Sequence, residues 1–242
     1  AKRLDNAIFW LGQDKQGAGQ VFRAQGYQAK RISTMAVEQK IQGAIAAGHD
    51  VSQACAYALQ YNGHATYCLQ VPGLDTTWCY DVASSQWHER AEFPQGDYAQ
   101  HRADYHAYCY GKHIVAGQDS ESLWYYDVNA NTNAGDVLVR DRISPHYASP
   151  SLDRISFGDF ELDCTVGKGL AGQSDATVMM RYSNDGGVSW PNPWRYSTLG
   201  AVGETQAPAK FTRNGSAKDR VWHVRVTDDV PFAIVNAAIE AS

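Results

Sequence analysis

Two copies of the pentapeptide Trp-x-Tyr-Asp-Val lie 46 residues apart, at Trp78–Val82 and Trp124–Val128. Each copy follows short segments rich in aromatic and apolar residues, which are typical of strands. A repeat of about 40 to 50 residues that holds several short strands has the spacing of propeller blades. Only two or three such units are visible, whereas a propeller typically contains about four to eight blades. Either further blades lie outside this chain, or the sheets are arranged differently.

Turn signals separate the strand-like segments. Asn62-Gly63 joins the predicted strands Ala54–Tyr61 and Ala65–Val71, because this dipeptide favours tight hairpins. A second turn is predicted at Gly111-Lys112. Aromatic residues make up 12% of the chain, and large aromatic side chains suit pleated, half-buried sheets. The sequence therefore predicts an all-β fold.

One segment departs from the strand pattern. Apolar residues recur at spacings of three and four from Val37 to Ile45, which indicates a helix. Ser33 or Thr34 can cap its beginning, and Gly48 is a natural stop. We predict one helix over about residues 34–47, inserted between two β units.

The pattern changes near Pro145–Pro150, where loop-like residues precede the alternating segment Ile155–Val166. Phe232–Ile239 is predicted as an apolar final strand. We therefore predict two parts. Residues 1–147 form propeller-like blades of short antiparallel strands with the inserted helix, and residues 148–242 form a C-terminal β subdomain.

The charge balance and apolar runs exclude some classes of protein. The net charge is −5 and the pI about 5.9, which argues against a protein that grips nucleic acid through a basic surface. The longest apolar stretches are shorter than a membrane span, so no membrane insertion is expected.

The cysteines predict no disulfide framework. Their number, five, is odd, and no CxxC pair occurs. We expect free thiols in a reducing cytoplasm. Because the first residue is Ala1 and a strand-like run follows at once, we also expect the chain to be part of a longer protein.

The most specific motif is an Asp-box, S-x-D-x-G-x-[ST]-W, formed by Ser183, Asp185, Gly187, Ser189 and Trp190. The carboxylate can accept backbone N–H bonds across a hairpin turn, glycine permits a positive φ, and tryptophan covers the base of the hairpin. We interpret the box as a structural motif. The alternative is a propeller hydrolase of the sialidase type, which needs several arginines and a Tyr–Glu pair. No spacing in the chain singles out such a set.

Two other segments contain residue types that occur at metal or phosphate sites. His101 and His106 are five residues apart, so on a strand they face opposite sides and cannot easily share a metal ion. Gly167–Gly172 is glycine-rich but lacks the GK[ST] ending of a phosphate loop, and no helix pattern follows it. We predict no catalytic residue, no cofactor and no metal.

The chain resembles the packaged-DNA stabilisation proteins of short-tailed (podovirus) bacteriophages, also called tail-nozzle or tail-hub proteins. The resemblance covers almost the whole chain. The matching segments are Ile8–Gln13, Arg31–Thr34 with the helix after it, Gly63–Tyr67, Thr77–Val82, Trp87–Arg90, His106–His113, Met180–Gly187 with Trp190, Lys218–Val221 and Pro231-Phe232. Members of the family are about twice as long, so the chain corresponds to their C-terminal half.

The resemblance implies a β-propeller-rich virion protein, assembled in the host cytoplasm and located in the phage tail. It implies a homo-hexameric ring next to the portal-adaptor ring, the tail needle and the tailspikes. Such a ring closes the portal channel, stabilises packaged DNA and forms part of the ejection conduit, through which double-stranded DNA passes transiently. It implies no catalytic residue.

Two alternatives remain open at this point. The Asp-box and the abundant aromatics fit a propeller-type glycan hydrolase or glycan-binding protein. The repeat spacing fits a host-encoded kelch-like interaction module.

Overall fold

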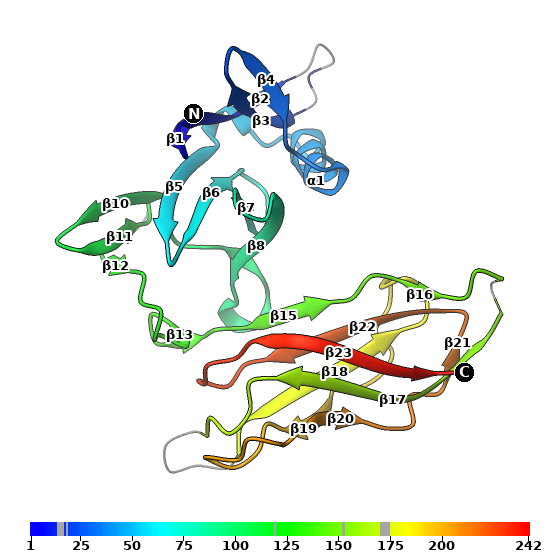
Figure 1. The fold of residues 1–242 in the computed structure, drawn as a ribbon. Coiled ribbons are helices and arrows are strands. Elements are labelled where there is room, and N and C mark those ends of the chain that lie inside the picture. The colour runs from blue at the N-terminus through cyan, green and yellow to red at the C-terminus, as the bar shows by residue number, and fades with distance from the viewer. Residues whose placement is uncertain (14–16, 18, 119, 152, 170–174) are drawn as a thin grey trace. The chain divides into compact units, whose positions relative to one another are not determined.

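The computed structural model describes residues 1–13, 17, 19–118, 120–151, 153–169 and 175–242. The chain divides into two units, Ala1–Ala130 and Asn131–Ser242. Both are built from antiparallel strands, and one α-helix is present in the described residues (Figure 1). The predicted all-β class with a single helix is confirmed.

The N-terminal unit contains three antiparallel sheets that follow one another along the chain. The strands of the first sheet are β1 (Lys2–Leu4), β2 (Ala7–Gln13), β3 (Gly19–Gln25) and β4 (Gln28–Arg31). Those of the second are β5 (Cys55–Tyr61), β6 (His64–Gln70), β7 (Thr77–Asp81), β8 (Gln86–Glu92) and β9 (Ala99–Gln100). Those of the third are β10 (Tyr105–Cys109), β11 (Lys112–Ala116) and β12 (Leu123–Tyr125). In each sheet, consecutive strands are neighbours, as in propeller blades.

The two Trp-x-Tyr-Asp-Val segments occupy equivalent places. Trp78 lies on β7 and Trp124 on β12, the third strands of their sheets. Trp78 packs into the core shared with the first sheet, and Trp124 packs against the core shared with the second. The sequence repeat therefore marks a structural repeat.

Tight hairpins connect several of these strands. Asn62 and Gly63 have φ values of 51° and 82°, which match the two-residue turn that the sequence predicted. The next hairpin turns at Tyr110 and Gly111, with φ values of 52° and 72°. The predicted turn at Gly111-Lys112 was therefore one residue late, since Lys112 already begins β11. The two glycines of Asp14–Gly19 also predict a hairpin loop, but most of that segment lies outside the described residues.

The helix α1 (Met35–Ala46) follows the first sheet. Thr34 is its N-cap residue, but its side chain makes no capping hydrogen bond. The Ser33 hydroxyl accepts the Val21 N–H at 3.1 Å and donates to Glu38, so it ties the helix to β3. Gly48, with φ of 86°, ends the helix as predicted. Gly19 permits close packing, because an added Cβ would lie 2.4 Å from Ile41 Cγ2.

Two cores cover the two faces of the second sheet. On one face, Tyr67, Leu69 and Trp78 pack with residues of the first sheet and α1. On the other, Tyr57 and Cys68 pack with residues of the third sheet. Side chains alternate across a strand, so one strand supplies both cores. Successive sheets therefore stack face to face, as in a propeller.

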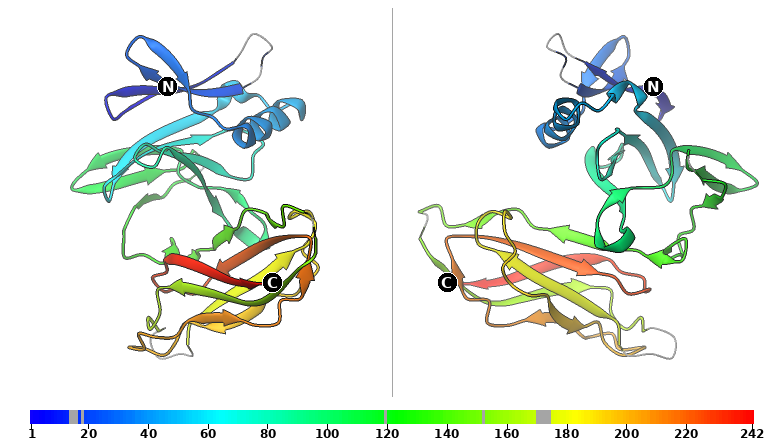
Figure 2. Two further views of the ribbon diagram at one scale, coloured as in Figure 1. Left: turned by 45° about the vertical axis from the view of Figure 1, so that its right-hand side comes forward. Right: turned by 180° about the vertical axis from the view of Figure 1, so that it is seen from behind.

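The C-terminal unit is a β-sandwich. Its first sheet contains β15 (Arg140–Ile143), β16 (Tyr147–Ala148), β18 (Thr177–Ser183), β19 (Arg195–Thr198) and β22 (Asp219–Val226). Its second contains β17 (Ile155–Cys164), β20 (Ala209–Phe211), β21 (Ser216–Ala217) and β23 (Ile234–Ala241), and the red β23 lies along β17 (Figure 2). Between them lies one apolar core, with Trp222 near its centre. The short hairpin of β13 (Thr132–Asn133) and β14 (Asp136–Val137) and the 3-10 helices η1 (Val51–Gln53) and η2 (Pro94–Gly96) complete the described elements.

The two units divide between Ala130 and Asn131, whereas the predicted division lies between residues 147 and 148. β15 and β16 both pair with β22, so the residues of these two strands belong to the sandwich.

The triplet Arg-Ile-Ser follows the last strand of the first sheet at Arg31–Ser33. It recurs at Arg142–Ser144 and Arg154–Ser156, which lie inside the sandwich and not at the end of a blade. The final strand begins two residues later than predicted, and most of its side chains are exposed.

Within the described ranges, no helix has the length and apolar character that a membrane span requires.

We expect Phe9→Ala to destabilise the N-terminal unit by about 3–5 kcal/mol, the usual cost of truncating a buried phenylalanine. The Phe9 side chain is 0% exposed, and its ring stacks on Tyr67 at 5.4 Å between centroids. The measurement is urea unfolding followed by tryptophan fluorescence. Ile8→Ala is the matched control, since Ile8 is adjacent but 50% exposed. An equal loss in the free energy of unfolding in the two variants would contradict the burial of Phe9 and the exposure of Ile8 on opposite faces of β2.

Candidate functional site

The Asp-box lies in the connection between β18 and β19 of the C-terminal unit. Ser183 ends β18 and is buried, and its hydroxyl accepts the N–H of Gly187 at 2.9 Å. Asp185 is exposed, yet its carboxylate accepts the Ser189 N–H at 2.9 Å and the hydroxyls of Ser183 and Ser189. These hydrogen bonds lower the pKa of Asp185 to about 2. The box thus binds its own turn.

The glycines and the tryptophan of the box complete the turn. Gly186 and Gly187 have φ values of 73° and 89°, a region that favours glycine. An added Cβ on Gly187 would lie 3.7 Å from Trp190 Cζ2, so the indole lies beside the turn. Asn184 accepts a hydrogen bond at 2.8 Å from Arg220, whose side chain is buried in the core. The turn is therefore tied to the sandwich core.

Trp190 also begins a cluster of aromatic and charged side chains that we call the tryptophan–arginine stack. Its members are Asp141, Arg181, Trp190, Trp194, His223 and Arg225. Arg181 Cζ lies 5.0 Å from the ring centroid of Trp190 and 4.3 Å from that of Trp194. Arg225 Cζ lies 5.0 Å from the Trp194 ring. Each such cation–π contact contributes about 0.5–1 kcal/mol at exposed sites.

Asp141 neutralises part of the positive charge of the stack. Its carboxylate accepts two hydrogen bonds from Arg225, at 2.7 and 2.8 Å. His223 is buried, and its Nε2 lies 3.1 Å from Asp141 Oδ1. The guanidinium groups thus already have carboxylate and indole partners within the chain. Since two arginines lie over Trp194, its indole is not a free platform for stacking a sugar ring.

The histidines considered as metal ligands lie apart. His101 lies in a loop, and its ring stacks on Tyr126. His106 on β10 instead pairs with His113 on β11, with 3.0 Å between Nε2 and Nδ1. Burial and the adjacent His113 lower the pKa of His106. No group of three or more metal-ligating side chains occurs among the described residues. The His106–His113 pair was not predicted from the sequence, although both residues flank the hairpin turn.

Of the glycine-rich segment Gly167–Gly172, the last three residues lie outside the described residues. Gly167 has φ of 67°, and its N–H donates to Leu199 O at 2.9 Å.

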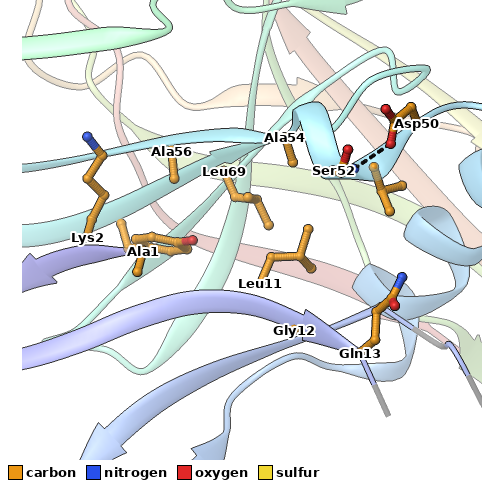
Figure 3. A pocket seen from close by; sticks show the side chains of 13 residues that line it. Ala1, Lys2, Leu11, Gly12, Gln13, Asp50, Ser52, Ala54, Ala56 and Leu69 are labelled. Atoms are coloured by element: carbon orange, nitrogen blue, oxygen red, sulfur yellow. Dashed lines mark hydrogen bonds between the residues drawn. The ribbon is translucent and has the colours of Figure 1, made fainter. Parts of the chain in front are cut away.

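A pocket of about 460 Å³ lies in the N-terminal unit (Figure 3). Small and apolar side chains such as Leu11, Ala54 and Ala56 line much of it. Among its described lining residues, Lys2 and Asp50 are the ones with charged side chains. Hydrogen bonds from the side chain of Ser52 and from its backbone N, the latter at 3.0 Å, lower the pKa of Asp50. No histidine is among the described lining residues, so the Ser52 hydroxyl has no imidazole base in this pocket.

The outer face of the third sheet is an exposed apolar surface that was not predicted from the sequence. Its most exposed members are Tyr105, Leu123 and Tyr125, with 52%, 71% and 52% of their surfaces accessible. Ile114 and Ala116 lie on the same face, since they are the cross-strand partners of Tyr125 and Leu123. The signal in the sequence was the consecutive apolar residues of Ile114–Ala116 and Leu123–Tyr125, which supply apolar side chains to both faces of the sheet.

Two family models match the chain. The model described as Bacteriophage P22 Gp10, beta-propeller matches residues 1–131, and the one described as Bacteriophage P22 Gp10, beta-sandwich matches residues 146–242. The stacked sheets and the sandwich agree with these descriptions, and the resemblance found in the sequence is confirmed. A phage family also favours a phage protein over a host-encoded kelch-like module.

The sequence matches no curated protein. One similar solved structure is a glycoside hydrolase, with 11% sequence identity over 97% of this chain and 70% of its own, and a TM-score of 0.20. A TM-score this low supports no conclusion about fold or chemistry.

We expect Asp185→Ala to lower the thermal unfolding midpoint of the C-terminal unit at neutral pH, without specific loss of a chemical step. The pKa of Asp185 is about 2 in the folded protein, below its ordinary value of 3.8. A lowered carboxyl pKa stabilises the fold above the unfolded pKa, and this contribution is lost as the pH falls through the folded pKa. The difference between wild type and variant should therefore shrink between about pH 4 and pH 2.

The measurement is differential scanning calorimetry across this pH range. Asp153→Ala is the control, an exposed aspartate of the same unit outside the box. A variant as stable as wild type at pH 7 would contradict a structural role for the box.

Proposed function

This chain belongs to the bacteriophage P22 Gp10 family, and from that premise we propose that it forms part of the tail nozzle that closes the portal channel. Membership of the family makes it a structural protein of the phage virion. The finer role is to retain the packaged DNA after packaging and to form part of the conduit through which the DNA is ejected. The observation that carries the proposal is the match of both family models, over residues 1–131 and 146–242.

The proposed partners follow from a place in the tail. The chain forms a homo-hexameric ring that contacts the portal-adaptor ring, the tail needle and the tailspikes. It assembles in the host cytoplasm, inserts into no membrane and needs no cofactor or metal. Contact with double-stranded DNA is transient.

The described residues support work by interfaces rather than by catalysis. The outer apolar face of the third sheet exposes Tyr105, Leu123 and Tyr125, and contiguous apolar surface of this kind is typical of protein contacts. We propose that a neighbouring subunit of the ring covers this face. Asp185 of the Asp-box and Arg225 of the tryptophan–arginine stack, in contrast, are hydrogen-bonded to groups of their own unit.

The charge of the chain suits a conduit. It contains 21 Lys and Arg against 26 Asp and Glu. A wall of like charge repels the phosphate backbone within about 10 Å at 0.1 M salt, and so lets DNA slide. Retention of the genome then depends on a mechanical plug held across the channel and not on attraction of DNA.

We expect the purified chain to bind double-stranded DNA more weakly than micromolar, even at low salt. The control replaces the exposed acidic residues Asp75, Asp97 and Glu121 with lysine, which changes the net charge from −5 to +1. This variant should gain affinity, with a steep dependence on salt. Fluorescence anisotropy of a labelled duplex at several salt concentrations measures both. Sub-micromolar binding by the wild type would contradict the proposed conduit and would favour a protein that clamps DNA directly.

A genetic experiment tests the place in assembly. Particles that lack the protein should package DNA and then lose it, because the channel stays open. Pulsed-field gels of heads purified at successive times measure the packaged genome. Heads that contain no DNA at the earliest time would contradict a role after packaging.

A further inference from the structure

Cys68 and Cys79 lie opposite each other on the neighbouring strands β6 and β7 of the second sheet. Their Sγ atoms are 3.1 Å apart, and both side chains are 0% exposed. The other cysteines are separated from this pair. Cys55 bonds Gln70 Oε1 at 3.3 Å, Cys109 lies on the third sheet, and Cys164 belongs to the sandwich. The chain therefore contains one pair of thiols at contact distance among its free cysteines.

The backbone at this pair already suits a disulfide. Directly opposed residues of antiparallel strands have Cα atoms about 4.5 or 5.5 Å apart, depending on the type of pair. Disulfides join Cα atoms about 4.4–6.8 Å apart, so either pair type is compatible. The sulfurs must approach by about 1 Å to reach the bond length of about 2.0 Å.

We propose that Cys68 and Cys79 are an oxidative modification site, at which a small-molecule disulfide converts the two thiols into a cross-strand disulfide. A thiolate of the pair attacks one sulfur of the oxidant, which forms a mixed disulfide and releases one small thiol. The second cysteine, after losing its proton, attacks the mixed disulfide and releases the other small thiol. Two protein thiols are oxidised, and one small disulfide is reduced to two thiols.

The surroundings in the folded sheet make the two thiols unequal. Burial opposes ionisation of Cys68, but the hydrogen bond donated by the Cys79 thiol and the charge of Arg90 outweigh it, so the pKa of Cys68 is lowered. Burial and the same hydrogen bond raise the pKa of Cys79. Arg90 on β8 is held in place by Tyr126, to whose hydroxyl it donates at 3.2 Å. In the folded sheet, Cys68 is therefore the thiol of the pair that ionises more readily.

Burial sets the rate of the reaction. Because both sulfurs are inaccessible, the oxidant reaches them only when the second sheet opens locally. Mild denaturant, which favours such opening, should accelerate the oxidation. Once formed, the bond should raise the thermal midpoint of the N-terminal unit by about 5–10 °C, since it restricts the unfolded chain.

A virion protein meets a reducing environment before release and an oxidising one after it. The expected timing of disulfide formation therefore rests on the proposed function. The reducing cytoplasm keeps the thiols reduced during assembly, and release exposes the particle to oxidising conditions. The second sheet would then be cross-linked after assembly. A bond that forms in the purified chain but is missing from released particles would overturn this timing alone.

The experiment exposes the purified full chain to oxidised glutathione, with and without mild urea. The sample is then unfolded and alkylated, and its mass is measured. We expect two of the five thiols to be lost. Trypsin leaves Cys55, Cys68 and Cys79 on one peptide, because no Lys or Arg occurs between Lys40 and Arg90. Cleavage at Asp75 separates Cys79 from the other two, so the linked peptides can be mapped.

Matched variants assign the bond. Cys55→Ser should still lose two thiols, whereas Cys68→Ser and Cys79→Ser should lose none. If either of these two variants fails to fold, wild type and Cys55→Ser decide the assignment. Five reactive thiols after treatment in mild urea, or a bond to any other cysteine, would overturn the proposal.

Discussion

The two-sided burial of the second sheet is the constraint on which the N-terminal unit depends. Alternate side chains of β6 and β7 enter opposite cores, so neither face of these strands is available to water. This explains why Thr77–Asp81 is buried at every position, including polar Thr77 and Asp81. Each sheet with two covered faces requires a sheet before it and a sheet after it. Stacking of successive meanders is the consequence, and the outer face of the third sheet is where that stacking stops.

The same constraint explains the chemistry found inside the unit. A thiol is small and apolar enough for a dry core, yet its charge state responds to neighbours. Arg90 enters this core only because Tyr126 and the paired sulfurs surround its guanidinium. Apolar packing and charge compensation therefore meet on one face of β6–β8. The opposite face contains aromatic rings, among them Tyr67, which stacks on Phe9, and Tyr80, which is tilted against it.

Features set by local chemistry could be predicted from the sequence. The Asn62-Gly63 hairpin, the helix and the Trp-x-Tyr-Asp-Val repeat depend on neighbours within a few residues or on one period. Features that depend on the pairing of strands far apart in the sequence could not be predicted. β15 joins the sandwich because Arg140–Ile143 pairs with β22, some eighty residues later, and no local pattern records that partner. The tryptophan–arginine stack likewise gathers Arg181, Trp194 and Arg225 from three separate segments.

The Asp-box illustrates why a motif shared with hydrolases need not bring their chemistry. A general acid works best when its pKa lies near the working pH. The carboxylate of Asp185 has a pKa of about 2, because Ser183 and Ser189 donate hydrogen bonds to its ionised form. Near neutral pH it is therefore a permanent acceptor, well suited to organising a turn and poorly suited to delivering a proton. The bonds that make the motif recognisable are also the ones that withdraw its carboxylate from proton transfer.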